Sequence, residues 1–219
     1  VNTSEMFYEV YFSKIVPEKK LLVMPNMPNL SLFKDYKRKT EGSFTIGFIG
    51  MIRYKEQIKM LIQAGSESNV QVFFAGTSLD NEIKELCEEK EWIEYYGKYD
   101  HSTEIAKLYG MVDCVYCVYD ADLFNVRIAL PNKLYEAIYC ELPIVVAKGT
   151  YLSELVEKLG VGVAINHKDK NELKQVLNRL SMDKKYYTTF VDACRKHKKE
   201  INTEYYNEKL KSKIEKIIN

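Results

Sequence analysis

Basic side chains stand directly after the first strand-like segment of this sequence. In GMIRYKEQIK (50–59), Gly50 permits a close turn, and Arg53 and Lys55 stand where the next helix would begin. Backbone N–H groups at a helix start, the helix dipole and fixed cations together favour a bound phosphate or diphosphate. A solvated basic turn is the alternative for this stretch taken alone, because Lys and Arg are common surface residues.

A second polar group opens the helix that LPNKLYEAIYCELPIVV (130–146) predicts. Pro131 suits a first helical turn, where its missing N–H costs nothing. Glu136 comes four residues after Asn132 and three after Lys133, so these three side chains can share one helix face. Such a face suits a ligand that carries phosphates and a pair of sugar hydroxyls. The alternative is that Glu136 simply pairs with Lys133 or Lys55 on a polar helix face.

Other familiar sites are absent from the sequence. It contains no GxxxxGK[ST] phosphate loop, no GxGxxG fingerprint, no HExxH and no GxSxG. The histidines, His101, His167 and His197, are too scattered to suggest a zinc site, so no metal site is predicted. Cys114 and Cys117 form a CxxC, but side chains three apart on a strand point to opposite faces, which predicts core packing.

The composition narrows the class of protein and its partners. The 219 residues carry 32 basic and 31 acidic side chains, a net charge of +1, which argues against nucleic acid as a partner. No apolar run reaches the roughly 18 residues that span a bilayer. Five cysteines in a chain of this size favour a reducing, cytoplasmic location over a disulfide framework.

Strand-length apolar runs alternate with helix-length amphipathic stretches along most of the chain. Alternation of this kind predicts an α/β fold with a doubly wound parallel sheet. Glycines at positions 50, 76 and 97 end three of the runs and place their turns at the carboxyl edge of the sheet, where such folds bind ligands. The expected strands are 44–50, 70–76, 92–97, 113–119, 143–147 and 161–165, with a loop over 120–129.

The two ends of the chain differ from this middle part. A helix is expected over 3–15, a strand over 20–25, and helices from about residue 169 to the end. The predicted domains are an appendage with a linker over 1–42, the main α/β domain over 43–200 and a C-terminal helix over 201–219.

Taken in order, five segments resemble the donor-binding C-terminal half of a GT-B glycosyltransferase of group 1 (family 4-like). They are FTIGFIGMIRYKEQIKMLIQA, VQVFFAG, YYGKYDHSTEIAKLYGMVDCVY, LPNKLYEAIYCELPIVVA and LSELVEKLGVGVAI, within 44–166. The resemblance implies the Rossmann-like half of a GT-B fold that binds a nucleotide-diphosphate sugar as donor substrate, with no further cofactor. The opening residues, VNTSEMFYEVYFSKIVPEKKLLVMPN, resemble the end of the acceptor-binding half.

The resemblance also implies roles for single residues. Arg53 and Lys133 are the expected catalytic cations, which hold the donor diphosphate as it departs. Glu136 is expected to hydrogen-bond the ribose, and Tyr99 to pack on the base. Further contacts with the diphosphate are expected from Gly50, Lys55, Asn132 and Leu134.

One position departs from the family's pattern. The family's signature is a pair of glutamates separated by seven residues, and Ile128 stands where the first of them is expected. That glutamate usually lies near the sugar. The departure leaves open which residue contacts the sugar and whether transfer retains its configuration.

The predicted function is transfer of a sugar from a nucleotide donor to a glycan or lipid-linked acceptor, in bacterial surface polysaccharide synthesis. The acceptor would bind through an N-terminal half that this chain lacks, so the chain alone is expected to transfer little. Contact with the inner face of the membrane is expected only in the full enzyme. Two alternatives stay open: a GT-B nucleotide-sugar 2-epimerase and a non-catalytic nucleotide-sugar-binding domain.

Overall fold

The main body of the protein is an all-parallel sheet of six strands in the order β3-β2-β1-β4-β5-β6. The computed structural model describes residues 1–77 and 80–218. The strands are β1 (Thr45–Ile49), β2 (Gln71–Ala75), β3 (Ile93–Gly97), β4 (Cys114–Cys117), β5 (Ile144–Ala147) and β6 (Gly162–Ile165). This order, in which the chain winds outward in both directions from β1 and β4, confirms the predicted doubly wound α/β fold.

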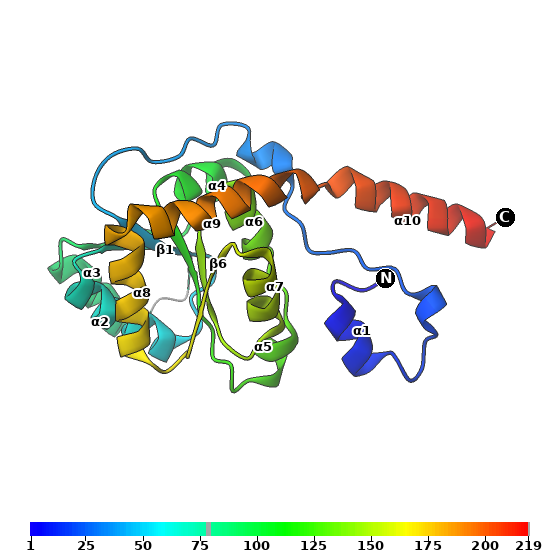
Figure 1. Cartoon of the computed structure of the whole chain (residues 1–219), viewed down its shortest axis with the longest axis horizontal. Coiled ribbons are helices and arrows are strands. Elements are labelled where there is room, and N and C mark those ends of the chain that lie inside the picture. Colours follow the sequence, from blue (N-terminus) through cyan, green and yellow to red (C-terminus); the bar gives the residue numbers. More distant parts are fainter. Residues whose placement is uncertain (78–79, 219) are drawn as a thin grey trace.

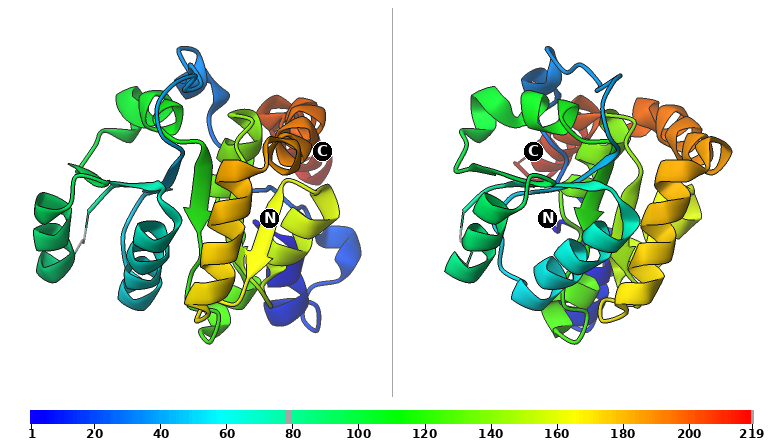
Figure 2. Two further views of the ribbon diagram at one scale, coloured as in Figure 1. Left: turned by 60° about the vertical axis from the view of Figure 1, so that its left-hand side comes forward. Right: turned by 90° about the vertical axis from the view of Figure 1, so that its left-hand side faces the viewer.

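Helices cover both faces of the sheet (Figure 2). One face is covered by α2 (Lys55–Ser68), α3 (Asn81–Glu89) and α8 (Lys170–Met182). The other carries α4 (His101–Gly110), α6 (Lys133–Tyr139), α7 (Tyr151–Leu159) and part of α9 (Lys184–His197). A last helix, α10 (Thr203–Ile218), runs away from the sheet (Figure 1). Within the described residues, no helix is both long and apolar enough to cross a membrane.

The strands feed two separate hydrophobic clusters because alternate side chains point to opposite faces. In β5, Ile144 and Val146 enter one cluster, whereas Val145 enters the other. Cys114 and Cys117 in β4 divide in the same way, and both are buried free thiols. The prediction that this CxxC is core packing is therefore confirmed.

Glycine is needed where β1 and β2 end at the carboxyl edge of the sheet. Gly50 and Gly76 have φ angles of 134° and 143°, a region that side chains strongly disfavour. A Cβ on Gly76 would lie 1.8 Å from the Gly50 carbonyl oxygen. The two turns thus pack backbone against backbone.

The connection between β4 and β5 contains more helix than the sequence predicts. The expected loop over 120–129 includes α5 (Phe124–Ile128), a helix too short for its periodicity to be recognised. The next helix, α6, begins at Lys133 rather than at Pro131. Asn132 already has helical angles, φ −59° and ψ −22°. Pro131 lies outside the helix, and its backbone carbonyl oxygen accepts a hydrogen bond from the Leu134 N–H.

The N-terminal segment is also less regular than predicted. The helix expected over 3–15 is α1 (Glu5–Tyr11), capped by the Ser4 side chain. The expected strand over 20–25 forms a single parallel bridge, Val23 with Asn2, because no longer strand lies beside it. Further on, Phe33 is buried against the sheet domain and the Tyr36 hydroxyl donates to the Cys140 carbonyl oxygen at 2.7 Å. The predicted boundary at residue 42 stays a prediction.

Candidate functional site

The Glu136 carboxylate is buried, with only 3% of the residue exposed. Its Oε2 accepts a hydrogen bond of 2.5 Å from the Tyr109 hydroxyl, which α4 presents. Its Oε1 accepts one of 2.8 Å from Asn132 Nδ2, one helical turn earlier in the chain. The shared face of Asn132 and Glu136 is therefore confirmed, and among the described residues neither Lys133 nor Lys55 forms an ion pair with this carboxylate.

A histidine and a tyrosine lie near this carboxylate. His101 Nε2 is 3.7 Å from Glu136 Oε1, and half of the imidazole is exposed. The nearby Glu136 carboxylate raises the pKa of His101 above its ordinary value of 6.5, while partial burial and, more weakly, Lys133 oppose the shift. Burial, with a smaller contribution from Glu136, raises the pKa of Tyr99 to about 12. We call Tyr99, His101, Tyr109, Asn132 and Glu136 the Glu136 cluster.

Lys133 points from the start of α6 across the carboxyl edge of the sheet. Its Nζ lies 5.2 Å from the centre of the Phe48 ring and 6.0 Å from that of Tyr119, which stabilises the ammonium by cation–π attraction. A Cβ on Gly50 would come within 2.7 Å of this nitrogen. Gly50 therefore makes room for Lys133 as well as for the turn, a pairing that the sequence did not predict.

The backbone amides at the start of α6 follow the prediction only in part. Within the described residues, the N–H groups of Asn132 and Lys133 have no hydrogen-bond acceptor. The Leu134 N–H, in contrast, donates to the Pro131 carbonyl oxygen at 3.3 Å, and the Leu134 side chain is 1% exposed. The first turn of the helix therefore already uses the Leu134 amide, and a contact of Leu134 with the diphosphate stays a prediction.

Arg53 and Lys55 lie where the sequence places them, around the start of α2. Arg53 is exposed, and its Nε donates to the Met51 sulfur. Lys55 Nζ lies 3.1 Å from an Asp80 oxygen and 3.2 Å from a Glu82 oxygen. Hydrogen bonds to Asp80 and then Glu82 raise the pKa of Lys55, so it stays a cation, but one that already has two counter-ions.

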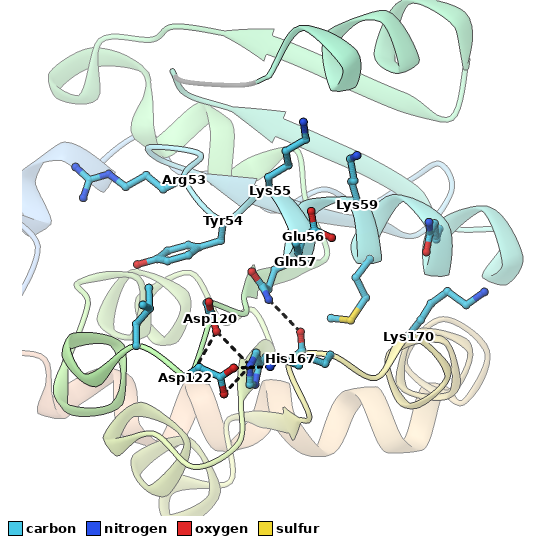
Figure 3. A pocket seen from close by; sticks show the side chains of 14 residues that line it. Arg53, Tyr54, Lys55, Glu56, Gln57, Lys59, Asp120, Asp122, His167 and Lys170 are labelled. Carbon is cyan, nitrogen blue, oxygen red and sulfur yellow. Dashed lines mark hydrogen bonds and ion pairs between the residues drawn. The ribbon is translucent and has the colours of Figure 1, made fainter.

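A cavity of about 690 Å³ lies beside these cations. We call it the α2 cavity, because the first turns of α2 form one wall; its other wall comes from the loops after β4 and β6 (Figure 3). Arg53 and Lys55 line it, whereas Asn132, Lys133 and Glu136 do not. The residues predicted from the sequence therefore do not form one group: Arg53 and Lys55 line the α2 cavity, and Asn132 and Glu136 lie in the Glu136 cluster. Lys133 lies over the turn at Gly50.

Sequence reasoning missed two members of the Glu136 cluster. Tyr109 stands on the apolar face of α4, where its pattern is that of a core residue, and the residue is fully buried. His101 begins the same helix directly after its N-cap, Asp100. The only sequence signal was the position of both residues in YYGKYDHSTEIAKLYGMVDCVY, one of the segments that resemble the family.

Ile128, which stands where the family's first glutamate is expected, is buried. The residue ends α5 and is 4% exposed, so it is a buried apolar side chain. A contact with the sugar at this position would have to come from another residue.

The chain was compared with known protein families and with curated proteins. A model of the family described as Glycosyl transferases group 1 matches residues 32–197. Among curated proteins, no sequence matches the chain. The family match includes every residue of the Glu136 cluster and the first turn of α2.

Similar solved structures share the fold at low sequence identity. Sucrose-phosphate synthase from Thermosynechococcus elongatus has a TM-score of 0.75 at 19% identity, over 99% of this chain and 57% of that one. The Anabaena protein HepE, in complex with UDP and glucose, has a TM-score of 0.74 at 17% identity, over 98% of this chain and 62% of that one. WaaG, a glycosyltransferase involved in lipopolysaccharide biosynthesis, has a TM-score of 0.72 at 14% identity, over 93% and 58%. The chain thus spans less than two thirds of these proteins, with the architecture of one half of a GT-B fold.

Proposed function

The chain belongs to the glycosyl transferases group 1 family, and we propose that it binds the nucleotide-diphosphate sugar donor of a hexosyltransferase. The sugar would pass to a glycan or lipid-linked acceptor in bacterial surface polysaccharide synthesis. Because the chain spans 57% of the first similar structure, the acceptor is proposed to bind a further N-terminal part, and this chain alone would transfer little. The full enzyme would work in the cytoplasm, with peripheral contact to the membrane.

The buried Glu136 carboxylate is the observation that carries this proposal. A buried carboxylate is costly unless hydrogen bonds compensate it, and Tyr109 and Asn132 provide two. Both oxygens keep further acceptor capacity, since a carboxylate can accept about four hydrogen bonds. A pair of ribose hydroxyls supplies donors of the kind that this carboxylate can still accept.

The cations at the carboxyl edge are proposed to hold the diphosphate. Lys133 lies over the turn at Gly50. Arg53 follows Gly50 by three residues and is exposed. Both would neutralise the charge that builds on the departing nucleoside diphosphate, which is electrostatic catalysis by groups already in place. Lys55 would contribute less, because Asp80 and Glu82 compete for its ammonium. The proposal includes no cofactor besides the donor substrate.

Tyr99 is proposed to pack against the base. It is a half-buried member of the Glu136 cluster and packs on the hydrophobic core. A ring held in this way offers a flat apolar surface next to the proposed ribose position. UDP is the first probe to use, because HepE is described in complex with UDP and glucose.

Calorimetric titration with nucleoside diphosphates tests the proposal. We expect at least one of UDP, GDP, ADP and dTDP to bind the chain, and Glu136→Gln to weaken that binding by about tenfold or more, as loss of hydrogen bonds to a charged group implies. Glu141→Gln is the matched control, because Glu141 pairs with Lys198 and Arg195 instead. Absence of binding by all four nucleotides would refute the proposal.

A non-catalytic nucleotide-sugar-binding domain is the second candidate. The observation that favours it is the buried Ile128, which offers no carboxylate near the sugar. The two candidates differ in the full-length protein: a transferase consumes donor when acceptor is present, whereas a binding domain does not. A 2-epimerase would convert the donor sugar without any acceptor.

A further inference from the structure

Two aspartates and a histidine meet at one end of the α2 cavity (Figure 3). Asp120 and Asp122 follow β4, and His167 follows β6. His167 Nε2 lies 3.3 Å from Asp120 Oδ1 and 3.6 Å from Asp122 Oδ1. One nitrogen or oxygen atom from each of the three side chains lies within 4.8 Å of the other two.

His167 Nε2 is a buried polar atom without a hydrogen-bond partner in the described part of the chain. The imidazole is 11% exposed. Although Asp120 Oδ1 is 3.3 Å away, the contact lacks the direction of a hydrogen bond. Buried polar atoms nearly always have partners, so an unsatisfied one calls for an ion or water that completes its environment.

Two hydrogen bonds fix the segments that carry these side chains. Gln57 Nε2, from the buried face of α2, donates to the His167 carbonyl oxygen at 3.3 Å. The Asp122 backbone N–H donates to Asp120 Oδ1 at 3.1 Å, which orients that carboxylate. Three separate elements, the loop after β4, the loop after β6 and α2, therefore hold the cluster together.

The distances from His167 Nε2 to the two carboxylates match those between ligands of one metal ion. Ligands bound at about 2.0–2.2 Å from a cation lie about 3–3.6 Å from one another in tetrahedral or octahedral geometry. We propose that Asp120, Asp122 and His167 bind one divalent cation of the Mn²⁺ or Zn²⁺ class. Carboxylates suit Mn²⁺ and imidazole suits Zn²⁺, so a mixed set of two oxygens and one nitrogen takes either.

The neighbouring Lys168 does not compete for the Asp122 oxygen that would bind the cation. Lys168 Nζ contacts Asp122 Oδ2, so it leaves Oδ1, the oxygen that faces His167. Three protein ligands leave at least one coordination position, which opens into the α2 cavity. The sequence predicted no metal site, because nothing in its pattern joins His167 to the aspartates. The inference holds whether or not the chain binds a nucleotide sugar.

Titration with Mn²⁺ alone, followed by electron paramagnetic resonance, tests the site. The signal of free Mn²⁺ should fall until one ion is bound per chain, and pulsed measurements should detect ¹⁴N coupling from the imidazole. His167→Gln and Asp120→Asn should each weaken binding by about tenfold or more, since each removes one of three ligands. Zn²⁺ should displace the bound Mn²⁺.

Matched variants separate this site from general attraction to carboxylates. His197→Gln and Asp192→Asn make the same chemical changes on α9, where His197 pairs with Glu200 and Asp192 with Arg195. Both should bind Mn²⁺ like the unchanged chain. The inference is overturned if the unchanged chain binds no Mn²⁺ at millimolar concentration, if bound Mn²⁺ shows no ¹⁴N coupling, or if His167→Gln, folded by circular dichroism, binds it unchanged. Any of these results would mean that His167 serves only as an ion-pair partner.

Discussion

The Tyr109 hydroxyl donates a buried hydrogen bond of 2.5 Å to Glu136 Oε2 and so joins α4 to α6. Burial and the neighbouring carboxylate both raise the pKa of Tyr109 well above its ordinary value, so the phenol keeps its proton and remains the donor. Asn132 binds the other oxygen of the same carboxylate. Glu136 is thereby held in one orientation before any ligand arrives.

Tyr109→Phe should lower the free energy of unfolding by about 1.5–3 kcal/mol, because it removes a hydrogen bond to a buried charge. Tyr116→Phe is the control: its hydroxyl is equally buried, but it donates at 2.9 Å to a neutral carbonyl, that of Gln57. The control should lose about 1 kcal/mol. Urea denaturation measures both values. Equal losses would mean that the charge of Glu136 adds nothing to the bond.

Lys133→Gln should weaken nucleoside diphosphate binding by about 10–100-fold, the effect of losing one charge-assisted hydrogen bond. Lys158→Gln makes the same change on the exposed side of α7 and should have no effect. Calorimetric titration at two salt concentrations provides the measurement, since the Lys133 contribution should shrink as salt screens it. Unchanged affinity in Lys133→Gln would remove this residue from the proposed site.

Gly76→Ala should destabilise the fold by more than about 3 kcal/mol, because it combines a strained backbone with a steric clash. Its Cβ would lie 1.8 Å from the Gly50 carbonyl oxygen. Gly149→Ala separates the two causes: Gly149 has a φ of 74° but nothing within 4 Å of its added Cβ. That variant should lose only about 1–2 kcal/mol. Thermal unfolding would contradict the argument if the two variants melted together.

His101 should make a contribution to stability that depends on pH. Its folded-state pKa is raised above 6.5 by Glu136, so protonation is favoured more in the folded chain than in the unfolded one. The contribution is fully present below pH 6.5 and is lost as the pH rises through the raised folded-state value. The gap in melting temperature between the unchanged chain and His101→Gln should therefore be larger at about pH 5.5 than at about pH 8.5.

A second variant assigns the cause of this pH dependence. In a Glu136→Gln background the carboxylate that raises the His101 pKa is gone, so His101→Gln should shift the melting temperature equally at both pH values. The effect in the unchanged chain will be small, because half of the imidazole is exposed to solvent. A pH dependence that survives in the Glu136→Gln background would point to Asp100 instead, the other acidic group that raises this pKa.

The sequence by itself determined the architecture, because the relevant physics is local. Alternation of apolar runs with amphipathic stretches predicts parallel strands and crossover helices, and all six predicted strands overlap the observed ones. Glycines at 50 and 76 predict turns at the carboxyl edge, and both have positive φ angles. The pairing of Asn132 with Glu136 could also be predicted, since it spans one turn of one helix.

Only the tertiary structure decided which distant side chains meet. Tyr109 reaches Glu136 because α4 and α6 pack on the same face of the sheet, and His167 reaches Asp120 because β4 and β6 end at the same edge. Neither contact follows from local periodicity, since both depend on strand order and on how helices pack against the sheet. For the same reason the sequence could not show that Gly50 makes room for Lys133.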